Sequence, residues 1–447
     1  MVKEDEKAEN SDEKEKKEIR TSFFKEDGFY FEQILTEKKK VGFAMYNPST
    51  DEVKLIPEYE TPDYIFKPIE AQEVYEGYIY LPSKTEEYDS DEKLEEDLKT
   101  FIRKWLDIPE DFLQYCVWEI KQSWIYDKLN TINYLRFLGD LGQGKTRALT
   151  VVGFLHYKPI KTSGASTVAP IFRIAHKWKG TFLIDEFDLK KSDETADFIK
   201  FINLGFERHN PIMRCDQNKF DDIKFFDPYC PKIMATRKPI TDKATESRCF
   251  THIMEGTERT DIPLVLDDRF YKGAQHLRNK LLLWRFRNYG KIKVENTEDV
   301  DLGELEPRIK QTHLGLVPLF RDEPKKWEFF KEYLQKLQKR IVNERMSSFE
   351  YLIIKAFCEL VFELGYKDVI PKDLIVQGNF IDFSKSPEEP MEPRKLSKWL
   401  KGLGLGERED AKLVDRKTIT PIKFTKEQLK KLAKKYGFDI KNEYKLI

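Results

Sequence analysis

The fold class is decided by one stretch of the chain: Tyr134-Leu135-Arg136-Phe137-Leu138-Gly139-Asp140-Leu141-Gly142-Gln143-Gly144-Lys145-Thr146. Its first half has the apolar pattern of a β-strand, and its second half satisfies G-x-x-x-x-G-K-[ST] in full. A helix-competent run, residues 147–154, follows at once. Glycines let backbone N–H groups turn towards a phosphate, and the start of a helix adds the positive end of its dipole. Strand, loop and helix in this order predict a phosphate-binding loop (P-loop) in an α/β fold.

The residue types in this loop have defined chemical roles. We expect Lys145 to reach the β- and γ-phosphates of a nucleotide and the Thr146 hydroxyl to bind Mg²⁺. The stretch therefore predicts ATP and Mg²⁺ as cofactors. The predicted nucleotide-binding residues are Gly139, Asp140, Leu141, Gly142, Gln143, Gly144, Lys145, Thr146 and Arg147.

A second motif follows further along the chain, where the apolar strand 181–184 ends in Asp185 and Glu186. Parallel α/β sheets bind ligands in the crevice beyond the carboxyl ends of their strands. We therefore expect Asp185 to hold the metal together with Thr146, and Glu186 to polarise the attacking water. The two motifs in this order predict a core that hydrolyses nucleoside triphosphates.

A third strand is predicted at 232–235, and Thr236 follows it. A polar side chain at this strand end can orient the water that attacks the γ-phosphate. Arg248, within Glu246-Ser247-Arg248-Cys249, is placed to act as a finger that reaches the γ-phosphate of a neighbouring subunit. For Arg208 and Arg214, which also lie in this stretch, a structural or solvated role is the expectation.

The run from Leu138 to about Met254 resembles an AAA+ type P-loop ATPase. Asp185-Glu186 matches the family's second nucleotide motif, Thr236 its sensor position, and Ser247-Arg248-Cys249 the arginine-finger box of clamp-loader subunits. The resemblance implies a ring, with a hexamer as the expected size, in which Arg248 acts in trans.

A closer resemblance, over residues 85–290, is to the ATPases of phages, plasmids and integrated elements that are related to the helicase part of primase-helicases. The matching elements are Thr162-Ser163-Gly164-Ala165-Ser166-Thr167, Phe172-Arg173, Thr181–Glu186, Asn203-x-Gly205-Phe206-Glu207-Arg208 and Pro211-Ile212-Met213-Arg214. Where relatives tend to carry Gly-Pro-Lys, this chain has Tyr229-Cys230-Pro231-Lys232, and residues 1–130 contain no primase active-site pattern. The resemblance implies helicase or ATPase activity, and the missing pattern argues against a fused priming activity.

Composition divides the chain into parts of different character. Lys and Arg number 78 against 79 Asp and Glu, so no global charge indicates a partner. Residues 51–100 hold 16 acidic and 5 basic side chains, whereas residues 391–447 hold 16 basic and 8 acidic ones. We predict a disordered charged tail (1–22), an acidic β-rich module (23–88), a helical lead-in (89–129), the ATPase core (130–265), a helical lid or linker (266–346) and a C-terminal domain (347–447).

The C-terminal domain has the pattern of a winged helix. Helices are predicted at 349–364, 372–377, 394–403 and 426–436, with a small hairpin near 412–424. The third of these helices presents basic side chains and Trp399, and this element enters the major groove in helix-turn-helix modules. We expect DNA contacts from Arg394, Lys395, Lys398 and Lys401; the alternative is a module that mediates assembly.

A second candidate DNA contact lies between the two nucleotide motifs, in the segment 158–165. Its predicted contact residues are Lys158, Lys161, Thr162 and Ser163. An ordinary polar loop explains the same residues equally well.

Several classes of protein are excluded by the remaining patterns. No apolar stretch is long enough to span a membrane, and residues 1–22 lack the apolar core of a signal peptide. The five cysteines have neither CxxC nor zinc spacing. We therefore expect a cytoplasmic protein.

These patterns predict an oligomeric, Mg²⁺-dependent ATPase that acts on DNA, with a replicative helicase or translocase of a mobile genetic element as the leading interpretation. One alternative is a DNA-bound loader, initiator or regulator that does not unwind. Another is a signalling or defence ATPase that acts on protein, with the acidic module 23–88 as the partner surface. A third, a module that binds nucleotide without turnover, is disfavoured by the intact Lys145, Thr146, Asp185 and Glu186.

Overall fold

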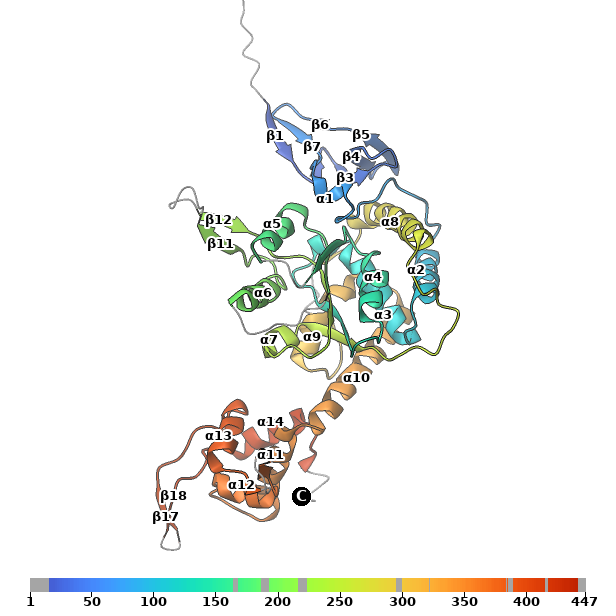
Figure 1. Ribbon diagram of the computed structural model, residues 1–447. Helices are drawn as coiled ribbons and strands as arrows, with labels where there is room; N and C mark the ends of the chain where they lie inside the picture. Colours follow the sequence, from blue (N-terminus) through green and yellow to red (C-terminus); the bar gives the residue numbers. More distant parts are fainter. Residues whose placement is uncertain are drawn as a thin grey trace, which may run out of the picture. The chain divides into compact units, whose positions relative to one another are not determined.

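The computed structural model describes residues 16–163, 168–185, 193–215, 223–294, 300–320, 322–382, 384, 389–414 and 417–440. The chain divides into two compact units, Met1–Glu328 and Phe329–Ile447 (Figure 1). Each unit is described by itself below.

A five-stranded parallel sheet forms the centre of the first unit. Its strands, in spatial order, are β14 (Cys249–Ile253), β8 (Tyr134–Leu138), β13 (Lys232–Thr236), β10 (Phe182–Asp185) and β9 (Ile160–Ser163). The inner strands β8, β13 and β10 are almost wholly buried, which agrees with the apolar runs that predicted them. The expected α/β core is thus confirmed.

Helices precede, cover and follow this sheet. They are α1 (Gln72–Tyr75), α2 (Asp91–Trp105), α3 (Glu110–Ser123), α4 (Lys145–Gly153), α5 (Val168–Trp178), α6 (Asp193–Leu204), α7 (Lys243–Glu246), α8 (Asp268–Tyr289) and α9 (Pro307–His313), with 3-10 turns at Tyr126–Lys128 and Leu314–Leu319. Helix α4 packs on β8, β13 and β10. Gly153 permits this close approach, because a Cβ there would overlap the side chain of Leu183.

The helical lead-in consists of two helices, α2 and α3. The Ser90 hydroxyl accepts a hydrogen bond of 3.2 Å from the N–H of Lys93 and caps α2. Pro109 then stands directly before α3, where its missing N–H costs nothing. Both helices bury the apolar faces that the sequence pattern predicts, including Trp105 and Trp118.

Two small sheets make up the N-terminal module. One is antiparallel, in the order β2 (Phe23–Glu26), β3 (Phe29–Leu35), β4 (Val41–Asn47) and β5 (Glu52–Ile56). The other has the order β1 (Lys17–Arg20), β7 (Tyr64–Lys67) and β6 (Tyr59–Glu60). The expectation of a disordered tail over 1–22 is therefore wrong for residues 17–20, which pair in parallel with β7. Charged residues form this strand because β7 supplies the hydrogen-bond ladder; residues 1–15 lie outside the described part of the chain.

A buried cluster of charges joins the N-terminal module to the core. Glu32 on β3 has no exposed side-chain surface, and its carboxylate lies 2.6 Å from Lys158 Nζ and 3.2 Å from Arg285 Nε. Arg285, on α8, also pairs with Asp127 at 2.7 Å. Lys158 donates further to the carbonyl and hydroxyl oxygens of Ser22. Burial lowers the pKa of Lys158, and the charge of Glu32 opposes that change.

The second unit is mainly helical. It contains most of α10 (Pro324–Met346), then α11 (Phe349–Cys358), a π-helical turn (Glu359–Glu363), α12 (Pro371–Gln377), α13 (Pro393–Gly402) and α14 (Lys426–Lys435). Two short antiparallel pairs accompany them: β15 (Ile381–Asp382) with β16 (Glu389–Pro390), and β17 (Lys412–Val414) with β18 (Lys417–Ile419). Leu396, Leu400 and Leu429 belong to one apolar core shared by these helices.

The division between the units lies earlier than the expected boundary at 347. The second half of α10 packs within the second unit: Arg345 donates to the carbonyl of Lys435, and Gly437 lies against Val342 and Met346. None of the helices in the described part of the chain has both the length and the apolar character needed to cross a bilayer.

The buried cluster gives a prediction for stability. Replacing Glu32 by Gln leaves Lys158 and Arg285 buried without their shared carboxylate, which costs about 3–5 kcal/mol. The thermal unfolding midpoint of the full chain is expected to fall by several degrees in a calorimetric scan. Glu37→Gln is the matched control, because that side chain is 78% exposed and lies 3.7 Å from Lys84. Equal melting of the two variants would contradict the assigned role of Glu32.

Candidate nucleotide-binding site

The crevice at the carboxyl ends of β8 and β13 is the point where the connections of the sheet diverge. The chain leaving β8 runs through α4 to β9 at one edge, whereas the chain leaving β13 runs through α7 to β14 at the other. Ligands of open α/β sheets bind at such a topological switch point. The P-loop connects β8 to α4 and therefore lies in this crevice.

The loop owes its shape to glycines and to one side-chain contact. Gly142 and Gly144 have φ of 80° and 84°, a region in which other residues are strained. The N–H of Asp140 donates to the Gln143 side-chain oxygen at 2.6 Å and closes the turn. Gly144 is the N-cap of α4, so the free N–H groups of the first helical turn face the loop. This arrangement suits a bound phosphate chain.

Lys145 supplies positive charge at the loop. Its side chain is largely buried, and Nζ donates to the carbonyl oxygen of Asp140 at 2.6 Å. The ammonium group thus lies against the backbone of the loop itself, where a β- or γ-phosphate would meet it.

The Thr146 hydroxyl and the Asp185 carboxylate meet across the crevice, at 3.1 Å. Thr146 comes from α4, which follows β8, and Asp185 comes from the carboxyl end of β10. Strand β13 lies between β8 and β10 in the sheet. Oxygen ligands of this kind fit Mg²⁺, which commonly takes one or two protein ligands and fills its shell with water and substrate phosphates. Within the described residues no cluster of three or more His, Cys, Asp or Glu offers an alternative metal site.

Thr236 is the last residue of β13, the strand between β8, which leads into the P-loop, and β10, which ends in Asp185. It is 1% exposed, and its hydroxyl has no hydrogen-bond partner in the structure. Its carbonyl accepts from the N–H of Gly139 at 3.2 Å, which holds the strand end against the start of the P-loop. A buried hydroxyl without a partner is costly unless a ligand or water joins it. The hydroxyl of Thr236 is therefore available to a ligand or water, and its role in orienting the attacking water stays a prediction.

Glu186, the predicted general base, lies outside the described residues. So do residues 164–167, which belong to the motif that precedes α5.

The side chain of Arg147 binds backbone carbonyl groups of other segments. Its guanidinium donates to the carbonyl oxygens of Pro263 at 2.7 Å, Leu264 at 2.6 Å and Trp105 at 3.3 Å. The guanidinium is thus engaged with protein carbonyl groups, and the expectation that Arg147 binds nucleotide stays a prediction. Arg147 holds the segment that leaves β14 against the first turn of α4. Leu264 is 96% exposed on that segment.

Arg248 lies at the opposite end of the sheet from the P-loop. Its carbonyl accepts from the N–H of Tyr134, the first residue of β8, while the P-loop begins after Leu138, the last. Tyr134 and Leu138 are four residues apart along β8, which corresponds to about 13 Å. Arg248 therefore cannot reach the phosphates of its own chain.

The first set of predicted DNA contacts is corrected in part. Lys158 is 1% exposed and paired with Glu32, so it is not available to a nucleic acid. Residues 160–163 form the edge strand β9 instead of a loop, because β10 and the Tyr78 segment both hydrogen-bond to it. Lys161 is exposed, whereas the Thr162 hydroxyl donates to the carbonyl of Leu183. Ser163 is the last residue of this strand, and residues 164–167 lie outside the described part of the chain.

The second set lies on α13, and all four of its basic side chains are exposed: Arg394, Lys395, Lys398 and Lys401. Positions 394, 398 and 401 share one helical face, opposite the buried Leu396 and Leu400. Lys395 differs from the others because it pairs with Asp382 and donates to Ser384.

The sequence analysis did not identify the hairpin of β11 (Ile212–Cys215) and β12 (Ile223–Phe226). Met213 and Phe225 are directly opposed and exposed on one face of it, together with Ile223. On the other face Arg214 pairs with Asp197 at 2.8 Å, a structural role as expected. Two short runs of alternating apolar residues on either side of a polar segment are the signal that could have revealed this hairpin.

Comparison with known proteins gives matches among solved structures. No family model and no curated protein matches the chain. The structure is similar to the apo A form of the NrS-1 C-terminal region, with a TM-score of 0.37 and 10% identity, over 88% of this chain and 96% of that chain. It is similar to the SCCmec type IV Cch active helicase, with a TM-score of 0.41 and 11% identity, over 94% of this chain and 73% of that chain. It is also similar to JCV helicase, with a TM-score of 0.27 and 11% identity, over 56% of this chain and 66% of that chain. Because these scores are low, the function proposed below is based on the residues of this chain.

The contacts of Arg147 give a prediction. Arg147→Ala removes the hydrogen bonds that hold residues 263 and 264, and bonds from a charged donor contribute about 1.5–3 kcal/mol. Amide hydrogen exchange in the 255–266 segment is expected to become about tenfold faster or more. Lys145→Ala, next but one along the chain, is the control and should leave exchange there unchanged. An unchanged rate in Arg147→Ala would refute this role.

Proposed function

We propose that the chain is a Mg²⁺-dependent ATPase that works on DNA as an oligomer, and that it acts as a helicase or translocase. The observation that carries the ATPase part is the convergence of the P-loop, the Thr146–Asp185 pair and the unpartnered Thr236 hydroxyl in one crevice. Each group has a place in phosphoryl transfer to water.

In the proposed reaction, the N–H groups of the P-loop and the Lys145 ammonium bind the phosphate chain. Mg²⁺, held by Thr146 and Asp185, would neutralise charge on the β- and γ-phosphates. Thr236 accepts or donates a hydrogen bond at the γ-phosphate side, because β13 lies between β8 and β10. Glu186 is assigned as the base by its position directly after Asp185.

The DNA part of the proposal is supported by the charge of the second unit. Residues 391–447 hold 16 basic and 8 acidic side chains, and α13 presents three basic residues on one face. We propose that α11–α13 with the β17–β18 hairpin form a winged helix, in which α13 enters the major groove.

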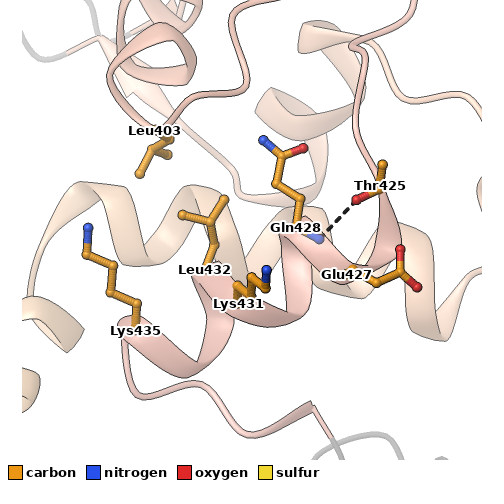
Figure 2. Close-up of a pocket in the computed structure, with 7 residues that line it drawn as sticks. All are labelled: Leu403, Thr425, Glu427, Gln428, Lys431, Leu432 and Lys435. Atoms are coloured by element: carbon orange, nitrogen blue, oxygen red, sulfur yellow. Dashed lines mark hydrogen bonds between the residues drawn. The ribbon is translucent and has the colours of Figure 1, made fainter. Parts of the chain in front are cut away.

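Helix α14 adds a second basic surface in the same unit. A cavity of about 380 Å³ lies between α14 and the turn after α13, lined by Leu403, Thr425, Glu427, Gln428, Lys431, Leu432 and Lys435. Figure 2 shows Gln428, Leu432 and Lys435 extending from α14 on the side where Leu403 lies. Gln428 also donates to the carbonyl of Gly404 at 3.1 Å, which ties the two helices together. A DNA backbone lying on α13 would find phosphate partners in Lys431 and Lys435.

The ATPase proposal is tested by steady-state hydrolysis with Mg²⁺ or with EDTA. Lys145→Ala is expected to lower kcat by at least about 100-fold, and Thr236→Val by about 10- to 100-fold with little change in KM, because that hydroxyl acts on the transition state. Thr150→Val is the matched control: its hydroxyl donates only to the carbonyl of Thr146 within α4. Full activity in Lys145→Ala would refute the site.

The DNA proposal is tested by binding of the full chain to single- and double-stranded DNA across a range of salt concentrations. Replacing Arg394, Lys398 and Lys401 by Gln is expected to weaken binding to all sequences and to reduce the salt slope by about 0.9 for each lost phosphate contact on duplex DNA. The control replaces Lys38, Lys39 and Lys40, which are exposed on the β3–β4 turn and carry the same total charge. Equal weakening by both triple variants would assign binding to overall charge instead of α13.

Strand displacement separates the two remaining DNA-directed interpretations. Hydrolysis that DNA stimulates, coupled to unwinding of a forked duplex, supports the helicase. Stimulated hydrolysis without unwinding indicates a loader or initiator, and hydrolysis that ignores every nucleic acid tested would direct attention to a protein substrate.

A further inference from the structure

Arg408 joins the C-terminal hairpin to α13 in the second unit. Its Nη2 donates to the hydroxyl of Ser397 on α13 at 3.0 Å. The residue lies in the stretch that leads into β17, where it is paired with Ile422 in an antiparallel bridge. Ile422 is fully buried in the core of this unit. A guanidinium group is thus held at the junction between the helix and the hairpin.

The backbone around Arg408 is fixed by the base of the hairpin. The N–H of Lys423 donates to the carbonyl of Glu407 at 3.0 Å, on one side of the bridge. The N–H of Glu409 donates to the carbonyl of Pro421 at 2.9 Å, on the other side. The position of Arg408 is therefore set by a hydrogen-bond ladder that begins before β17.

Arg408 has no carboxylate partner among the described residues. Its Nη1 is enclosed by the protein and forms no hydrogen bond. Glu407 pairs with Lys423 at 3.0 Å, and Glu409 pairs with Lys412 at 2.5 Å. Burial lowers the pKa of Arg408, and no nearby charge contributes to this shift. A half-buried cation in this state would be stabilised by an anion.

The guanidinium of Arg408 extends the basic face of α13. Ser397, which it contacts, lies three residues after Arg394 and four before Lys401. Residues at these spacings are neighbours on a helix surface, with about 5–6 Å between their Cβ atoms. The side chains of Arg394 and Lys401 are exposed. The three cations therefore border one stretch of surface that runs from α13 to the base of the hairpin.

We propose that Arg408 binds a backbone phosphate of duplex DNA at the junction between α13 and the hairpin. The inference rests on the proposed binding of DNA by the second unit and adds a contact outside α13. Phosphate contacts carry no sequence information but fix the register and orientation of a protein on the duplex. Arg408 would thus orient α13 in the major groove.

The chemistry of a guanidinium suits this role. Its N–H donors form a planar fork, so Arg408 can keep its bond to Ser397 while another N–H binds a phosphate oxygen. The major groove is about 12 Å wide and is bounded by the two backbones, so a helix lying in it has a backbone beside each flank. A backbone presents phosphates in series and can meet Arg394, Lys401 and Arg408 together, whereas a free phosphate ion cannot.

The proposal is tested by binding of the full chain to a labelled DNA duplex at several salt concentrations. Arg408→Gln is expected to weaken binding about tenfold and to lower the salt slope by about 0.9, the value for one lost phosphate contact. Arg340→Gln is the matched control, because that arginine is exposed on α10 in the same unit and its replacement removes the same charge. Equal effects of the two variants, or unchanged binding by Arg408→Gln, would overturn the proposal.

Two further variants separate contact with DNA from support of α13. Ser397→Ala removes the hydroxyl that Arg408 binds but keeps the cation, so the salt slope should equal that of the wild type. A loss of slope as large as that of Arg408→Gln would mean that Arg408 only supports the helix, which overturns the phosphate contact. Arg408→Lys keeps the charge without the fork, so affinity should fall a few-fold at an unchanged slope. If Arg408→Gln does not fold, unchanged affinity in Arg408→Lys overturns the proposal.

Inorganic phosphate is the probe for a free anion at this site. If phosphate raises the melting temperature of the wild type but not of Arg408→Gln, and this variant binds DNA normally, the site belongs to a free anion and the assignment to DNA is overturned.

Failure of this inference is distinct from failure of the proposed function. If replacing Arg394, Lys398 and Lys401 weakens binding and Arg408→Gln does not, α13 binds DNA without the junction, and the inference alone is overturned. If the wild type binds no DNA at any salt concentration, the proposed DNA-binding function itself fails.

Discussion

The parallel register of β8, β13 and β10 is the constraint on which the nucleotide site depends. Thr236 lies opposite Leu138, and Ile184 lies opposite Met234, so the three strands end at nearly the same level. Because the strands are parallel, the P-loop, the Thr236 hydroxyl and the Asp185 carboxylate all emerge at one edge. A shift of one residue in any strand would turn these side chains to the other face of the sheet and separate Thr146 from Asp185.

The parts of the site that could be predicted from sequence are those whose chemistry is local. One loop and the start of its helix contain Gly142, Gly144, Lys145 and Thr146. The positive φ angles of this loop occur at glycines, so the sequence indicates them directly. The strands and helices around them were also predictable, since buried strands need unbroken apolar runs and long helices need a repeating apolar face. The strand bounds at 134–138 are the clearest case.

What could not be predicted depends on partners far away in the chain. Lys158 was expected on a DNA-contacting surface because a lysine in a polar segment is usually exposed, but Glu32, 126 positions earlier, draws it into a buried pair. Arg147 follows the P-loop directly, yet its partners are carbonyl groups at 105, 263 and 264. Charged residues 17–20 form a strand only because β7 lies beside them. In each case one segment fixes the conformation of another that carries no signal of its own.

The two ends of the parallel sheet carry different chemical groups. At the carboxyl end lie the groups that we propose to hold a nucleotide and its metal: loop amides, an ammonium group, the Thr146–Asp185 pair and an unpartnered hydroxyl. At the amino end, the guanidinium groups of Arg248 and Arg308 pack on the ring of Phe206, and the carboxylates of Asp242 and Glu207 lie near enough to interact with their charges. The sheet keeps its two ends about 13 Å apart along β8, so under the proposed function Arg248 would meet a phosphate only in a neighbouring molecule.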